Sequence, residues 1–420
     1  MKRRASLLSF SFLCLFAIPV AHAESAEPYA GQTISVLLPP WGTLPKAMTD
    51  NFTAQTGIKI NMETLGWDEI HAKILTAMIA NTAPADVTEV DWSWVGQFGA
   101  AGWYVPLQNK ISPAIIKDIA PAKIFMTGGN LIAMPYNNDF RVLIVNKKMF
   151  EQAGITTMPK TMDELWNDAV ALKKSGVTYP IALPLSATEG TSTAWYLLTK
   201  AFNGELFDAN MNPAFTSPNS AGYKALEWIV RAVKAGLIDP ASTGLTDVQV
   251  QSFLAGGKAA IDLAGWAGNL TVYNDPTKSK VAGNVVAALM PNVTGHSRSF
   301  GLPEALGIPI NATHKGAALT FIKWWMQPNV QIQAYASLGD LPTSTTALSE
   351  LSHEGKIPSG NVLLKQIPSV EPLFAQGAPA WYPQFSAGVS SAINEAAKGQ
   401  LTVAQAVAQI AATVQKAKSQ

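Results

Sequence analysis

The chain has 420 residues and a formal net charge of +1, from 30 basic and 29 acidic side chains. This near-neutral balance argues against nucleic acid or an anionic membrane surface as the main partner. A single cysteine excludes a disulfide framework, so the core must hold the chain together, and the length is enough for two domains. The 12 tryptophans are a high number that needs an explanation.

Residues 1–23 have the three parts of a secretory signal peptide. Residues 2–4 are basic, residues 7–20 form an apolar run too short to span a bilayer as a mature helix, and residues 21–23 supply a small-residue cleavage site. Cys14 does not follow a small residue, which argues against a lipoprotein. We therefore expect export to a bacterial periplasm, with the leader removed after Ala23.

The first elements alternate between strands and helices. Residues 32–42 (QTISVLLPPWG) predict a buried strand ended by two prolines, and a helix follows. Residues 57–65 predict a second strand, residues 67–81 an amphipathic helix, and residues 85–91 a third strand. This alternation is typical of a parallel sheet with helices on its faces.

The middle of the chain departs from this rhythm. Residues 131–150 contain two β-rich runs joined without a helix. Thr161 and Glu164 form a capping box that opens a helix ending near Gly176. The next amphipathic stripe predicts a helix with Pro218 in its first turn.

The last third predicts further α/β structure. A short strand leads into Trp266, residues 284–291 form a buried strand, and residues 316–328 form a helix stopped by proline. A final helix follows Thr402. Because no repeat or low-complexity linker divides the chain, we expect two α/β halves that are interleaved or tightly joined.

Motifs for catalysis and cofactors are missing. The stretch AGGKAA resembles a phosphate-binding loop but lacks its first glycine and its Ser or Thr, and the histidines after the leader have no metal-ligand spacing. We expect no cofactor and no metal. A pair of carboxylates for glycoside hydrolysis stays open, because its members can be distant in sequence.

Aromatic side chains recur where predicted strands end. Rings at such positions can stack on the C–H faces of a sugar while neighbouring carboxylates and amides take its hydroxyls. Asp91 and Trp92 can share one ligand only if their strand ends there. Any one such ring is more often core packing, but four separate sites favour binding. The residues are Trp41, Asp91 with Trp92 and Trp94, Trp266, and Trp381 with Tyr382.

The chain resembles the extracellular solute-binding proteins, family 1, which are carbohydrate receptors of bacterial ABC importers related to maltose-binding protein. The long stretch MPYNNDFRVLIVNKKMFEQAGITTMPKTMDEL matches the family pattern almost position by position. FTAQTGIKI, ILTAMIANTAPADVTEVDW and FLAGGKAAIDLAGW match weaker motifs in the same order. Ala85 is inserted in the family's commoner Pro-Asp-Val turn, which blurs the register just before Asp91.

The resemblance implies a periplasmic binding protein fold, with two α/β lobes around a ligand cleft and several hinge crossings. It implies an N-terminal lobe of residues 24–136 and 290–328, and a C-terminal lobe of residues 137–289 and 329–420. It also implies a monomer that closes around a sugar and docks on a membrane permease. Ligand contacts are implied at Trp41, Asp91, Asn137, Asp139, Trp266, the glycine loop at Gly301, and Trp381 with Tyr382. We add Arg298, which would suit an anionic sugar if it faced the cleft.

Three functions remain open at this stage. The first is a sugar receptor without catalysis. The second is a receptor of the same fold for a polyamine or another cation, which would require several converging carboxylates and few neutral polar groups. The third is a secreted carbohydrate-active enzyme. The sequence does not identify the sugar, its size or its charge.

Overall fold

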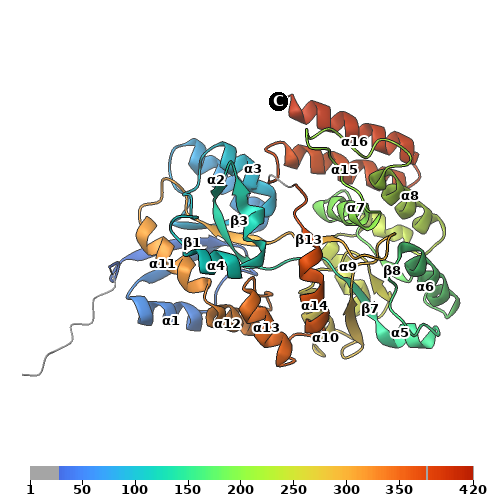
Figure 1. The fold of residues 1–420 in the computed structure, drawn as a ribbon, viewed down its shortest axis with the longest axis horizontal. Helices are drawn as coiled ribbons and strands as arrows, with labels where there is room; N and C mark the ends of the chain where they lie inside the picture. The colour runs from blue at the N-terminus through green and yellow to red at the C-terminus, as the bar shows by residue number, and fades with distance from the viewer. Residues whose placement is uncertain (1–27, 375–376, 420) are drawn as a thin grey trace, which may run out of the picture.

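The computed structural model describes residues 28–374 and 377–419 (Figure 1). The expected signal peptide, residues 1–23, lies outside the described residues. Two α/β lobes lie side by side in Figure 1, each built on its own sheet. Within the described part of the chain, every helix is too short or too polar to span a bilayer.

The first lobe is built on a five-stranded sheet. Its strand order is β2 (Lys59–Thr64), β1 (Thr33–Leu38), β3 (Val87–Asp91), β12 (Glu304–Gly307) and β6 (Ala133–Asn137). Strand β1 is parallel to β2 and β3, whereas β12 is antiparallel to both of its neighbours. The predicted strands near the N-terminus are therefore present, and a strand from far along the chain completes the sheet.

Helices cover this sheet and supply its core. Phe52 packs against Phe321 and Trp324, with ring centroids 5.3 and 5.2 Å apart, which joins an early helix to a late one. The helices of this lobe are α1 (Lys46–Thr56), α2 (Trp67–Ile79), α3 (Val95–Ala100), α4 (Pro113–Asp118) and α11 (Lys315–Trp325). The short strands β4 (Met126–Thr127) and β5 (Asn130–Leu131) form a hairpin beside them.

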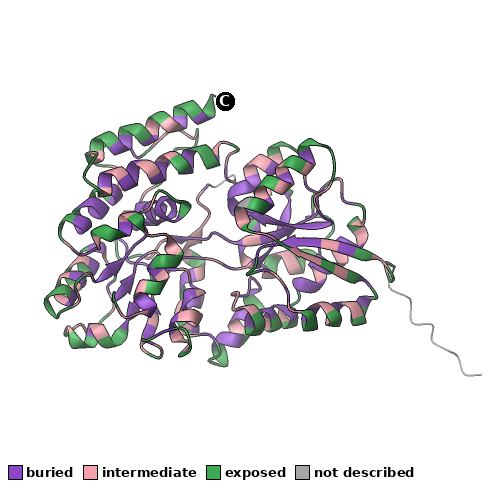
Figure 2. Ribbon diagram, turned by 180° about the vertical axis from the view of Figure 1, so that it is seen from behind, coloured by how far each residue is buried: buried purple, intermediate pink, exposed green. Residues whose placement is uncertain are grey.

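The second lobe is built on a four-stranded sheet with short strands. The order is β10 (Val285–Ala288), β7 (Leu143–Asn146), β9 (Ile261–Asp262) and β8 (Ile181–Ala182). Its helices are α5 (Lys147–Gln152), α6 (Met162–Lys174), α7 (Glu189–Ala201), α8 (Ala221–Lys234), α9 (Asp247–Ala255), α10 (Asn269–Asn274), α15 (Tyr382–Ala397) and α16 (Val403–Lys418). Figure 2 shows buried residues on the inner faces of these helices and exposed residues on their outer faces.

The starts of two helices in the second lobe test local predictions. The capping box at Thr161 is confirmed, because its hydroxyl accepts from the backbone N–H of Glu164 and the Glu164 carboxylate accepts from that of Thr161. The prediction that Pro218 lies in the first turn of the next helix is wrong. Ser220 caps that helix instead, so Pro218 lies before it. The helix begins after Ser220 because the serine hydroxyl accepts a hydrogen bond from a free N–H group of the first turn, which a proline cannot do.

The chain crosses between the lobes several times, and the crossing segments pair with each other. The first crossing joins β6 to β7, and the second joins β10 to β12. Arg141 N–H donates to the Phe300 carbonyl, and Leu302 N–H donates to the Asp139 carbonyl. A third crossing follows α12 (Pro328–Leu338), where the Leu341 carbonyl accepts from Asn138 N–H. The helices α13 (Thr345–His353) and α14 (Gly360–Gln366) and the short strand β13 (Val370–Glu371) come after it.

Candidate functional site

Two adjoining cavities lie between the lobes. The larger has a volume of about 370 Å³ and is lined by Trp41, Asn137 and Glu304 of the first lobe and by Trp266 and Asn269 of the second. The smaller has a volume of about 200 Å³. Because both cavities are lined by Asp139, Trp266 and Glu304, we treat them together as the cleft.

The end of β3 forms one wall of the smaller cavity. Strand β3 ends at Asp91, and a short 3₁₀ helix (Trp92–Trp94) follows directly. The Asp91 carboxylate caps this helix by accepting from Ser93 N–H at 2.8 Å, and it accepts from Trp67 Nε1 at 3.2 Å. Since the strand ends here, Asp91 and Trp92 line the same cavity.

Glu304 lies on the cleft wall formed by the first lobe. It is the first residue of β12, which lies between β3 and β6 and so brings a distant segment beside Asp91 and Asn137. Trp41 Nε1 donates to Glu304 Oε1 at 2.7 Å, and Asn137 Nδ2 donates to Glu304 Oε2 at 3.0 Å. These bonds fix the Trp41 ring at the cleft although 41% of this residue is exposed.

Trp266 forms the facing wall. The guanidinium of Arg141 lies 5.2 Å from the centre of the Trp266 ring, and Arg141 Nη1 donates to the Ala264 carbonyl at 2.9 Å. Arg141 Nη2 is 3.8 Å from Asp139 Oδ2. Arg141 of the first crossing segment therefore lies over the Trp266 ring, and Trp266 lines both cavities.

Burial changes the protonation of the cleft acids. Desolvation raises the pKa of Asp91 to about 6, against the opposing hydrogen bonds from Ser93 and Trp67. Desolvation also raises the pKa of Asp139 to about 6, with Arg141 opposing, and that of Asp340 to about 7. Burial and the nearby charges of Asp340, Asp91 and Asp139 raise the pKa of Glu304 well above its usual range.

Several residues expected in the site lie behind the cleft rather than on its surface. Trp94 is buried against Trp67 and His71, with ring centroids 5.0 and 4.8 Å away. Tyr382 is buried, with its ring 4.9 Å from that of Trp92 and its hydroxyl on the Glu189 carboxylate.

Trp381 and Gly301 are also away from the cavity walls. Trp381 packs against Phe207 and Phe385, with centroids 5.6 and 5.9 Å away. Gly301 pairs with Phe140 where two crossing segments meet. A Cβ there would lie 3.2 Å from the Asp139 carbonyl oxygen, so glycine permits the close approach of the two backbones.

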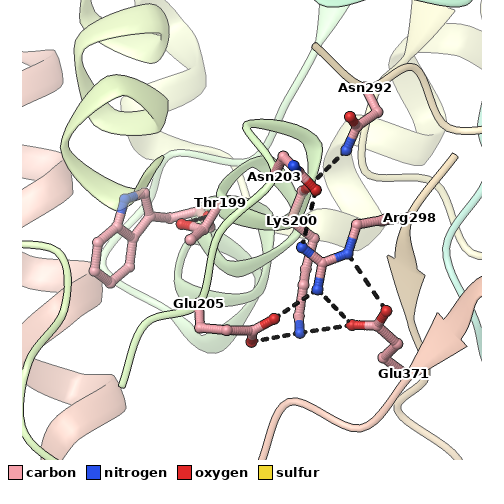
Figure 3. Close-up of polar contacts among 8 residues, drawn as sticks. Thr199, Lys200, Asn203, Glu205, Asn292, Arg298 and Glu371 are labelled. Carbon is pink, nitrogen blue, oxygen red and sulfur yellow. Dashed lines mark hydrogen bonds and ion pairs between the residues drawn. The ribbon is translucent and has the colours of Figure 1, made fainter. Parts of the chain in front are cut away.

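The structure corrects the expectation for Arg298, which lies outside the cleft in a cluster of charged side chains (Figure 3). Its Nη2 is 2.5 Å from Glu205 Oε1 and 2.7 Å from Glu371 Oε2. Lys200 Nζ is 2.6 and 2.9 Å from the same two carboxylates. The pairing of residues 299–300 with β13 places Arg298 beside Glu371 and the end of α7. We call Lys200, Glu205, Arg298 and Glu371 the ion-pair cluster.

Sequence reasoning missed several residues that line the cleft. Glu304 had a weak signal, a carboxylate that opens an apolar strand after Pro303. Arg141 and Asp340 had no sequence signal of their own. Arg141 lies in a crossing segment, and Asp340 follows a glycine. The missed lining residues include the charged or aromatic side chains of Trp67, Arg141, Glu189, Asp247, Glu304 and Asp340.

Comparisons with known proteins agree with this architecture. The family of bacterial extracellular solute-binding proteins matches residues 41–332. A relative from Sinorhizobium fredii, described as a probable amino-acid ABC transporter periplasmic-binding protein, is 24% identical over 377 residues, covering 86% of this chain and 82% of the relative.

Solved structures share the fold. A solute-binding protein from Agrobacterium radiobacter in complex with ribitol has a TM-score of 0.81 and 21% identity, covering 93% of this chain and 99% of that chain. The maltose-bound MalE3 of T. maritima has a TM-score of 0.78 and 19% identity, covering 91% and 99%. These similarities establish two lobes around a cleft.

Proposed function

Since the chain belongs to the bacterial extracellular solute-binding proteins, we propose that it receives a sugar or polyol of monosaccharide size in the cleft and delivers it to the membrane permease of an ABC importer. The observation that carries the proposal is the pair of tryptophans, Trp41 and Trp266, on opposite walls of one cavity. Indole faces stack on the C–H faces of a sugar, and the amides and carboxylates beside them bond to hydroxyls. A cavity of about 370 Å³ is at the small end of ligand sites.

Transport follows from closure of the lobes. The solute binds to one wall, the lobes close by bending at the crossing segments, and the closed form docks on the permease. We propose that this happens in the periplasm, after removal of residues 1–23, and that the protein acts as a monomer without catalysis. The ribitol-bound relative supports a small polyhydroxylated solute.

The lobe boundaries complete the proposal. We assign residues 24–136 to the first lobe and residues 137–289 to the second, as the resemblance implies. Because the second crossing leads into β12 and the third follows α12, we move the other two boundaries: residues 290–303 go with the second lobe, where Asn292 Nδ2 donates to the Lys200 carbonyl, and residues 304–338 go with the first. The packing of Phe52 on Phe321 supports the first assignment. The stacking of Tyr196 of α7 on Phe385 of α15 supports the second.

The test is a calorimetric titration with neutral sugars, polyols, amino sugars and amino acids. Amino acids are included because of the description of the Sinorhizobium fredii relative. We expect saturable binding of a polyhydroxylated solute, weakened roughly ten- to one-hundred-fold by Trp266→Ala. Trp166→Ala is the matched control, because Trp166 also stacks under an arginine, with Arg231 4.0 Å from its centre, but lies outside the cleft. Binding of amino acids alone, or equal losses in both variants, would contradict the proposal.

A further inference from the structure

The cleft contains more acidic than basic side chains. Among the described residues, Arg141 and Lys278 are the cations on its walls, and Lys278 has a side chain 62% exposed, 3.5 Å from Asp275. The buried part of the cleft therefore has one cation, Arg141. Six carboxylates line the walls of the two cavities, those of Asp91, Asp139, Glu189, Asp247, Glu304 and Asp340.

Neutral groups supply the hydrogen bonds of three of these carboxylates. Asp91 accepts from Ser93 and Trp67, and Glu304 accepts from Trp41 and Asn137. Glu189 accepts from the hydroxyls of Tyr382 and Ser386. These donors orient the acids without compensating their charge, so the repulsion among the ionised carboxylates remains.

Two carboxylate oxygens in the larger cavity have no partner among the described residues. They are Asp139 Oδ1 and Asp340 Oδ2, and both atoms are buried. Arg141 reaches Asp139 only through the other oxygen, at 3.8 Å. Glu304 lines the same cavity, and its charge interacts with those of Asp139 and Asp340. The larger cavity therefore has a negative end with two acceptors to satisfy.

We propose that the solute carries a protonated amine beside its hydroxyl groups, as an amino sugar or an amino polyol does, and that its ammonium binds where Asp139, Glu304 and Asp340 meet. The inference rests on the proposed function and narrows its substrate class. An ammonium donates three hydrogen bonds and compensates the charge that a neutral hydroxyl leaves unbalanced.

Other cations fit the cleft less well. A polyamine would place a second ammonium in the smaller cavity, where Arg141 repels it and where Asp91 and Glu189 already accept bonds from neutral donors. It would also leave the two tryptophan faces without a sugar ring. No group of three or more His, Cys, Asp or Glu side chains within residues 28–374 and 377–419 could hold a metal ion.

The experiment uses matched sets of probes that differ in one group. Each set contains an amine, its hydroxyl counterpart and, for sugars, its N-acetyl counterpart: glucosamine, glucose and N-acetylglucosamine; the same three for galactose; and glucamine with glucitol. At neutral pH we expect the amine of at least one set to bind ten-fold or more tightly than its neutral counterparts.

Variants separate this inference from the function on which it rests. Asp340→Asn and Asp139→Asn should each weaken amine binding about ten-fold or more, and should weaken binding of the neutral counterparts much less, so that the preference for the amine is lost. Glu151→Gln, at an exposed acid paired with Lys147, should leave that preference unchanged. A neutral sugar that binds as tightly as its amine would overturn the inference and leave the proposed function standing. Absence of binding by every member, neutral or charged, would overturn both.

Discussion

Acidic side chains gather in two places on this molecule, and their charge is balanced differently in each. In the ion-pair cluster, Lys200 and Arg298 each contact both Glu205 and Glu371 at 2.5–2.9 Å. In the cleft, six acids and one buried cation line the walls. The first arrangement is complete within the protein, whereas the second leaves charge and acceptors unsatisfied. We infer that the first serves folding and that the second serves binding at a cost in stability.

The pKa shifts of the two places run in opposite directions. Burial would raise the pKa of Glu371, but hydrogen bonds from Arg298 and Lys200 hold it below its ordinary value. Ionised Glu371 therefore stabilises the folded protein at pH values above the pKa of an unfolded glutamate. This stabilisation is lost as the pH falls through the pKa of Glu371 in the folded protein. Asp340 has its pKa raised to about 7 by burial, so its contribution is present below an unfolded value near 3.8 and is lost as the pH rises through about 7.

Removing a cation from the ion-pair cluster should have the largest effect. Lys200→Met keeps the buried stem but removes the charge from a side chain that is only 4% exposed. We expect the free energy of unfolding at pH 7 to fall by roughly 2 kcal/mol, because two partly buried carboxylates lose a donor. Denaturant unfolding measures this, with solute affinity unchanged.

Lys46→Met is the control for that variant. Lys46 pairs with Asp50 on the surface, with side chains 85% and 61% exposed, and should change stability by less than about 0.5 kcal/mol. Equal effects of the two variants would show that the ion-pair cluster is an ordinary surface contact.

Removing an acid from the cleft should raise the free energy of unfolding, whereas removing a cation from the ion-pair cluster lowers it. Asp340→Asn should raise the free energy of unfolding at pH 8 by roughly 1–2 kcal/mol, because the amide needs no ionisation in a buried site. Near pH 4 the gain should vanish, since Asp340 is then protonated in the folded protein. Desolvation is the cause of this gain, and Asp139, Glu304 and Lys278 are the other charged residues that line the same cavity.

Denaturant unfolding at the two pH values measures this gain. Asp50→Asn should show no such pH-dependent gain. A loss of stability at pH 8 in Asp340→Asn would mean that the ionised carboxylate has a favourable partner within the protein.

The smallest effect is expected from exchanging one cation for another in the ion-pair cluster. Arg298→Lys keeps the charge, but an ammonium cannot reproduce the guanidinium contacts to Glu205, Glu371 and Asn203 at once. We expect a loss of about 0.5–1 kcal/mol in unfolding free energy, seen as a small fall in melting temperature. No change in stability would show that the geometry of Arg298 contributes nothing beyond its charge.

The sequence predicted much of the fold because local patterns determine it. Apolar and alternating runs bounded by turns predicted β1, β2 and β3, and the family resemblance implied that the helix-free run between β6 and β7 crosses the hinge. Asp91 reaches the cleft because it ends a strand, and Trp41 and Trp266 reach it because they lie in the turns that follow strands. Such positions can be identified from neighbours in the chain.

The remaining features depend on contacts between distant segments. Glu304 reaches Asp91 only because β12 enters the sheet between β3 and β6, and no local pattern gives that order. Arg298 leaves the cleft because residues 299–300 pair with β13, some seventy positions later. The neighbouring residues in sequence predicted that Arg298 lies near the glycine loop at Gly301, but not the direction in which its side chain points.

The most direct test of unbalanced charge in the cleft is the number of protons exchanged when a solute binds. Calorimetric titrations near pH 6, in buffers with different ionisation enthalpies, would use the tightest-binding amine and its neutral counterpart. An ammonium beside acids whose pKa lies near 6 to 7 should make them ionise, so the amine should release protons to the buffer. Proton uptake, or no exchange with the amine, would contradict the account.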